Sequence, residues 1–140
     1  MDGKKIAEKV VEKMMCRDEF SQWLGIIVNE ISVGHCKLSM KVRKEMLNGF
    51  DIAHGGITYS LADSALAFAS NSHGRKAVSV ETGISHIISL REGDEISAVA
   101  EEVSLSNKIG IYNITISKKD GTVVALFKGT VYRTSKSWDV

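Results

Sequence analysis

The sequence predicts an α+β fold in which an antiparallel β-sheet wraps around one long central helix. Two observations lead to this prediction. Residues 55–72 are small or apolar almost all round, which is typical of a buried helix. Two strand-like runs precede this segment and four follow it, separated by polar or glycine-containing turns. A single buried helix among runs of strands is typical of the α+β class.

The chain begins with an amphipathic segment. Apolar residues fall at helical spacing within residues 3–20, and lysines and glutamates occupy the positions between them, so a helix is expected there. The 140 residues, of which 44% are apolar and 25% charged, fit one globular domain. No repeat, linker or low-complexity tract divides them, so we expect a single domain over residues 1–140.

The strand predictions come from alternation and turns. Residues 24–33 and 36–43 read as two strands around a Gly34-His35 turn, because apolar and polar side chains alternate in the second run. A helix over 55–72 is expected to end at His73-Gly74. The strands expected after it lie at 77–88, 94–105, 109–118 and 122–133. Asp120-Gly121 between the last two is a strong hairpin signal.

Composition and motifs exclude several classes of protein. A net charge of +1 gives no basis for binding nucleic acid or an anionic membrane. Cys16 and Cys36 do not form a disulfide framework, and we expect two reduced thiols and a cytoplasmic location. The four histidines lack metal-ligand spacing, and no phosphate-binding loop or nucleophile elbow is present. No metal or cofactor is therefore expected.

Asp63 is the first candidate for catalysis. It is the only formally charged residue from Gly55 through Ser72. Burying a carboxylate in such a segment is costly unless it is paired, and functional sites commonly accept this cost. The alternative is a solvated strip that Asp63 shares with Ser60, Ser64 and Asn71. Composition alone does not favour either interpretation.

The start of the same helix is the second candidate site. The first N–H groups of a helix have no partner within it, and the helix dipole favours negative charge there. Gly55-Gly56 would let a ligand approach these groups and form an oxyanion hole for a carbonyl. Asn48 and His54 flank the turn, and each could position a carbonyl or a water. The alternatives are a tight glycine turn, a capping histidine and an ordinary Asn-Gly turn.

The spacing of these groups has a consequence. Gly55 and Asp63 are eight residues apart, which is about 12 Å along a helix. Groups that act on one carbonyl must lie within about 3 Å of it. If both residues are catalytic, two helices must meet. The site would then be shared between two subunits of a homo-oligomer.

The pattern Asn48-Gly49, His54-Gly55-Gly56 and Leu61-Ala62-Asp63 resembles the phenylacetyl-CoA thioesterase-like branch of the hotdog superfamily. The resemblance covers about residues 22–133 and implies the hotdog fold, assembly into a homodimer or homotetramer, and hydrolysis of acyl-CoA. By this resemblance the Gly55 N–H binds the thioester carbonyl, with Gly56 beside it, and Asn48 places the water or the carbonyl. Asp63 of the partner subunit acts as general base or nucleophile, Ser79 of the same partner assists, and His54 shapes the turn.

Two other functions are compatible with such a fold. A non-catalytic acyl-CoA-binding or sensing module would not need Asp63, and no accompanying regulatory domain is expected in this chain. A hydratase or dehydratase needs an acid and a base, commonly Asp and His, but Phe68 stands five residues after Asp63. The sequence therefore favours a thioesterase over these two alternatives, and the resemblance implies aryl- or medium-chain acyl-CoA as its substrate.

Overall fold

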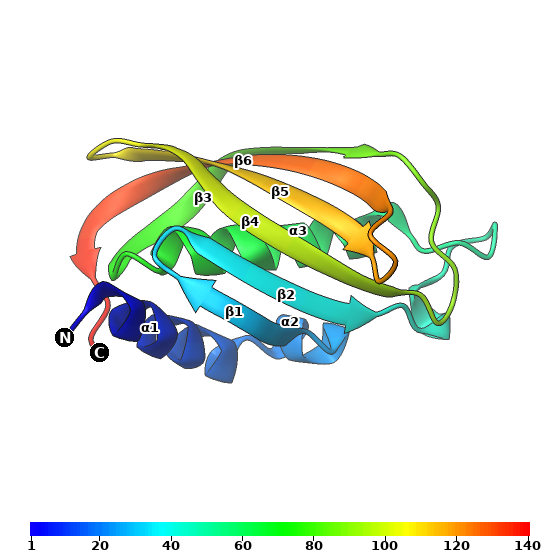
Figure 1. Ribbon diagram of the computed structural model, residues 1–140, viewed down its shortest axis with the longest axis horizontal. Helices are drawn as coiled ribbons and strands as arrows, with labels where there is room; N and C mark the ends of the chain where they lie inside the picture. The colour runs from blue at the N-terminus through cyan, green and yellow to red at the C-terminus, as the bar shows by residue number, and fades with distance from the viewer.

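The computed structural model describes residues 1–140, and its centre is a curved sheet that wraps around one helix (Figure 1). The sheet has six strands in the order β1-β2-β4-β5-β6-β3, and all neighbouring strands are antiparallel. The strands are β1 (Ile27–Ser32), β2 (His35–Lys41), β3 (Arg75–His86), β4 (Glu95–Leu105), β5 (Ile109–Lys118) and β6 (Val123–Ser137). This arrangement confirms the predicted α+β class and the hotdog fold.

The helices are α1 (Gly3–Arg17), α2 (Glu19–Leu24) and α3 (Gly55–Asn71), with a short 3₁₀ turn, η1 (Lys44–Met46). The helix expected over residues 3–20 is therefore two helices that meet at Asp18. The side chain of Asp18 accepts a hydrogen bond from the Ser21 N–H at 2.9 Å and caps α2. A new cap at this position ends α1, although the amphipathic pattern continues past it.

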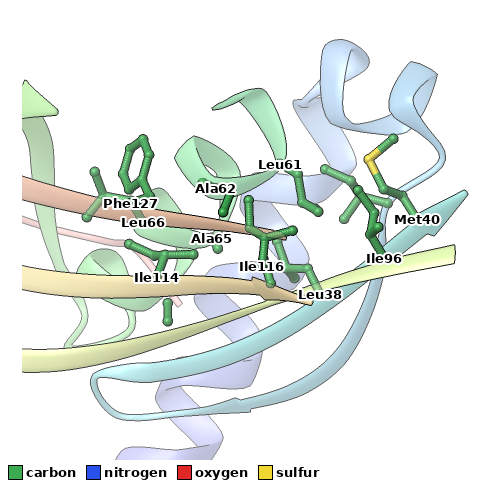
Figure 2. Close-up of a cluster of buried hydrophobic side chains, with 14 of the residues drawn as sticks. Leu38, Met40, Leu61, Ala62, Ala65, Leu66, Ile96, Ile114, Ile116 and Phe127 are labelled. Atoms are coloured by element: carbon green, nitrogen blue, oxygen red, sulfur yellow. The ribbon is translucent and has the colours of Figure 1, made fainter. Parts of the chain in front are cut away.

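The core lies between α3 and the concave face of the sheet (Figure 2). Leu61, Ala62 and Ala65 of α3 pack towards Leu38 of β2 and Ile114 of β5, and all five are buried. The side chains that alternate with these on the strands point to the opposite face, as the period of two predicts. Because the sheet curves around α3, most of the helix surface is covered. This explains why the sequence of α3 has no broad polar face.

The N-terminal helix α1 lies beside β1, near the C-terminal end of the chain (Figure 1). Ala7, Val10 and Val11 of α1 are buried against the rest of the molecule. The Lys13 ammonium donates to the Asp139 carbonyl at 2.7 Å, and this contact joins the two ends of the chain. No helix in the molecule is both long enough and apolar enough to cross a membrane.

Candidate active site

His54 fixes the start of α3. Its backbone N–H donates to the Met46 carbonyl at 2.8 Å, and its imidazole Nδ1 accepts the Gly56 N–H at 2.9 Å. His54 is thus the N-cap of α3. Its ring nitrogen accepts a hydrogen bond from a backbone N–H of the first turn, as the side-chain oxygen of a serine or aspartate cap commonly does. The capping interaction leaves His54 exposed at the surface.

Gly55 and Gly56 follow the cap and are exposed. The Gly56 N–H is already used by His54, whereas the Gly55 N–H has no hydrogen-bond partner within the chain. This free donor points out of the positive end of a 17-residue helix. Of the two glycines, Gly55 is therefore the one whose N–H is available to a ligand oxygen.

Asn48 shapes the loop before this turn. Its side-chain oxygen accepts hydrogen bonds from the backbone N–H groups of Phe50, at 2.9 Å, and Ile52, at 3.4 Å. Asp51, between them, has a positive φ of 61°, which this network holds in place. Since the oxygen is occupied, the amide nitrogen is the part of the Asn48 side chain that remains available as a donor.

Asp63 lies in the middle of α3 with its side chain exposed. The interpretation as a solvated strip is wrong for two of its members, because Ser64 and Asn71 are buried. Partial burial raises the pKa of the Asp63 carboxyl, and the negative charge of Asp18 raises it further. A carboxylate with a raised pKa is a better proton acceptor than an ordinary aspartate, which suits a general base.

Asp63 and Ser79 of β3 both line a pocket of about 390 Å³. The pairing of β3 with β6 shifts between Ser79 and Glu81, so a β-bulge lies next to this serine. The remaining walls come from α1, α3, β3, β6 and the C-terminal tail: Met14, Leu66, Ala67, Ser70, Asn71, Lys76, Ala77, Val78, Val131 and Trp138. Trp138 is held there by a 2.8 Å hydrogen bond from its indole N–H to Asn71.

The predicted site residues therefore form two groups. Asn48, His54, Gly55 and Gly56 gather at the start of α3, whereas Asp63 and Ser79 share the pocket further along the helix. Both groups belong to one continuous helix, so about 12 Å separate Gly55 from Asp63 within a chain. One chain does not bring its own Gly55 N–H and its own Asp63 carboxylate to the same atom.

Two further residues lie at the start of α3 and were not predicted. The His86 ring approaches Gly55, and the Thr58 hydroxyl lies between His86 and the Gly55 carbonyl. Thr58 and His86 are 28 residues apart and come from α3 and β3. In the sequence His86 is one of four histidines without metal-ligand spacing, and no local pattern links it to Gly55.

The other groups with potential chemistry are not arranged for it. No cluster of three or more His, Cys, Asp or Glu side chains is present that could hold a metal ion. Both cysteines are free, with Cys16 exposed and Cys36 buried. Burial raises the pKa of the Cys36 thiol to about 12, although a backbone hydrogen bond opposes the shift. Cys36 is therefore an inert core residue.

Comparison with known proteins identifies relatives along the whole chain. The model of the thioesterase superfamily matches residues 50–125. A relative from Archaeoglobus fulgidus is 38% identical over 133 residues, which cover 95% of this chain and 86% of the relative. The acyl-coenzyme A thioesterase PaaI of Escherichia coli is 35% identical over 116 residues, 83% of each chain. The solved structure of the E. coli PaaI protein, from the phenylacetic acid degradation operon, superposes with a TM-score of 0.95 and 31% identity. It covers 99% of this chain and 100% of that one.

Proposed function

Starting from the fact that the chain belongs to the thioesterase superfamily and is an acyl-CoA thioesterase with the hotdog fold, we propose that its substrates are aryl- or medium-chain acyl-CoA thioesters. Hydrolysis yields the free acid and CoA. The observation that carries the proposed hydrolysis at this site is the pair of free groups on α3: the Gly55 N–H at its start and the exposed Asp63 carboxylate in its middle.

The Gly55 N–H is the proposed donor to the thioester carbonyl. Its availability, its place at the positive end of α3 and the absence of a side chain all support this role. As water adds to the carbonyl carbon, negative charge develops on the carbonyl oxygen and the hydrogen bond becomes stronger. The Asn48 amide nitrogen is the proposed second donor, to the water or to the carbonyl.

Asp63 is the proposed general base or nucleophile. In the first case it takes a proton from water while the oxygen attacks the carbonyl carbon. In the second case the carboxylate itself attacks, and water later hydrolyses the resulting anhydride. In the first route the C–S bond breaks when the tetrahedral adduct collapses, and in the second it breaks as the anhydride forms, before water enters. In both routes the electron pair leaves with the CoA sulfur, which takes up a proton that comes from the water. Ser79, in the same pocket, is proposed to assist by hydrogen bonding to the water or the carboxylate.

We propose that each site joins Gly55 of one subunit to Asp63 of the partner subunit. The distance of about 12 Å along α3 supports this, because one chain cannot supply both groups. The edge of the sheet also supports it. The 12-residue strand β3 is the last in the sheet, so one side has no neighbour, and its Val78 and Val80 side chains are exposed. A long exposed edge of this kind presents unpaired N–H and C=O groups to which a strand of another chain can pair. A homodimer is the minimum assembly, and a homotetramer of two such dimers is compatible with it.

The pocket beside Asp63 supports the proposed acyl class. Its volume of about 390 Å³ and its apolar walls, among them Leu66, Val131 and Trp138, suit a ring or a chain of moderate length. Met14 of α1 and Trp138 line the pocket on the side of the chain termini.

The test is CoA release from a panel of phenylacetyl, benzoyl, acetyl, medium-chain and long-chain acyl-CoAs, with Asp63→Ala beside the wild type. Turnover is expected with the aryl or medium-chain members and should vanish in Asp63→Ala, which keeps its fold and its oligomeric state. Because Cys16 is exposed and would react with a thiol reagent, both proteins should carry Cys16→Ser. Near-normal turnover by Asp63→Ala would overturn the mechanism. Tight acyl-CoA binding without turnover by the wild type would identify a sensing module.

A further inference from the structure

His86, at the end of β3, lies directly against the α-carbon of Gly55 at the start of α3. A Cβ atom placed on Gly55 would be 3.2 Å from Nε2 of His86, and 3.7 and 3.9 Å from the two adjacent ring carbons. The edge of the imidazole that carries Nε2 therefore faces the α-carbon of Gly55. Only glycine fits this position without displacing the ring.

The other ring nitrogen of His86 reaches the same residue through Thr58. The Thr58 hydroxyl donates to the Gly55 carbonyl at 3.1 Å, and its oxygen lies 3.3 Å from Nδ1 of His86. A hydroxyl has one hydrogen, and the Gly55 carbonyl can only accept. The hydroxyl must then accept from His86, so the network assigns the proton to Nδ1 and leaves the Nε2 lone pair towards Gly55.

His86 thus holds Gly55 at its α-carbon and, through Thr58, at its carbonyl. Gly55 needs such support, because it is exposed, it is followed by a second glycine, and its N–H has no partner within the chain. A hydrogen-bond donor contributes to catalysis only when it already points to where negative charge develops. An error of about 1 Å in such a position can reduce a rate about 100-fold.

We propose that His86 is a positioning residue for thioester hydrolysis, which acts by fixing the Thr58 hydroxyl and, through it, the direction of the Gly55 N–H. The proposal rests on the proposed role of Gly55 in binding the thioester carbonyl. It assigns the effect to Nδ1 of His86 rather than to Nε2. His86 need not touch the substrate.

Asparagine and glutamine separate the two ring nitrogens. The asparagine amide nitrogen can take the place of Nδ1 and donate to Thr58, whereas the glutamine amide reaches the place of Nε2. Phenylalanine keeps the ring against Gly55 and removes both nitrogens. Steady-state rates should show a fall in kcat of about 10- to 100-fold for His86→Phe and His86→Gln, with KM within about twofold of the wild type. His86→Asn should restore kcat to within a few fold.

Thr58 and Tyr59 provide the matched variants. Thr58→Val should lower kcat as much as His86→Phe, Thr58→Ser should not, and the double variant should be no slower than either single one. The Tyr59 hydroxyl makes a separate hydrogen bond from α3 to β3, with Thr82. Tyr59→Phe and His86→Phe each remove a hydrogen bond between α3 and β3, so both should lower the thermal unfolding midpoint. Tyr59→Phe should nevertheless keep the wild-type kcat.

Three outcomes would overturn the proposal: wild-type kcat in His86→Phe, rescue by Gln instead of Asn, or an equal loss of kcat in Tyr59→Phe. These outcomes are distinct from failure of the proposed function. In that case the wild type shows no turnover on any thioester, or Asp63→Ala keeps its activity. If the wild type is active and Asp63→Ala is not, an active His86→Phe variant refutes only the role of His86.

Discussion

The hydroxyl groups of Ser21 and Ser64 lie 2.8 Å apart in the interior and join α2 to the middle of α3, one residue from Asp63. The Ser21 hydroxyl also donates to the Asp18 carboxylate at 2.6 Å. A continuous polar network therefore runs from the junction of α1 and α2 to the helix that carries Asp63. Through it the N-terminal segment places a second negative charge near the proposed catalytic carboxylate.

Asp18→Asn should move the acid limb of the pH profile of kcat/KM to lower pH. Burial is the larger cause of the raised pKa of Asp63, and the charge of Asp18 is the second. Only ionised Asp63 can act as base or nucleophile, so activity falls as the pH falls through its pKa. Removing the charge of Asp18 lowers that pKa, while asparagine still caps α2. An unchanged acid limb would show that Asp18 does not influence Asp63.

Asp63→Asn should lose at least about 100-fold in kcat and gain stability at neutral pH. A carboxyl whose folded-state pKa is raised binds its proton more tightly in the folded state, so ionisation at higher pH destabilises the fold. The variant should therefore unfold at a higher temperature than the wild type at pH 7. The difference should disappear below the unfolded-state pKa of 3.8. If the variant and the wild type unfolded at the same temperature at pH 7 as well as in acid, the raised pKa of Asp63 would be contradicted.

Much of the fold followed from periodic patterns. The alternation of residues 36–43 and the apolar run of 55–72 correspond to β2 and α3 because each pattern reports burial over several residues at once. The break at Asp18 was missed because the apolar Phe20 continues the predicted helix past it. Phe20 is 54% exposed, so an apolar residue there does not mark a core face.

The site was predicted only as far as it is local in sequence. His54, Gly55 and Asp63 belong to one turn and one helix, and their spacing predicts a site shared between subunits if Gly55 and Asp63 are both catalytic. The contacts of Thr58 and His86 with Gly55 depend on where β3 ends relative to α3. Sheet pairing with β6 sets that position, which no short motif encodes.

Gly129→Ala should lower the free energy of unfolding by about 1–3 kcal/mol. Gly129 of β6 faces Leu66 of α3, and an added Cβ would lie 2.5 Å from one Leu66 methyl carbon and 3.2 Å from its Cγ. Leu66 is buried, so the whole side chain must move. Leu66→Ala alone should cost about 2–5 kcal/mol through the cavity it leaves. The double variant should be more stable than the sum of the two losses predicts, as measured by denaturant unfolding.

Glu102→Gln should destabilise the protein by about 1–2 kcal/mol at pH 7. Burial alone would raise the pKa of Glu102, but hydrogen bonds from Tyr112, at 2.6 Å, and His73, at 2.5 Å, lower it overall. A lowered pKa stabilises the fold above the unfolded-state value of 4.5, and this contribution is lost as the pH falls through the folded-state value. Denaturant unfolding at pH 7 and pH 3 should show the gap between the variant and the wild type closing in acid. If the difference in free energy of unfolding between the variant and the wild type were the same at pH 7 and pH 3, Glu102 would be ruled out as the titrating group.

Ala67→Leu should narrow the range of acyl groups that the enzyme accepts. Ala67 is half-buried, follows Asp63 by one helical turn and faces the same pocket, so a leucine there fills space next to the carboxylate. Each extra methylene that a pocket cannot hold costs about 1–3 kcal/mol of transition-state binding, or about 10- to 200-fold in kcat/KM. The value of kcat/KM should therefore fall at least about 10-fold for phenylacetyl-CoA and little for acetyl-CoA, whose short acyl group does not reach residue 67. Acetyl-CoA is the internal control, because damage to Asp63 or to the fold would lower both values. Unchanged values of kcat/KM on both substrates would show that the acyl group binds elsewhere, whereas an equal loss on both would show damage to Asp63 or to the fold.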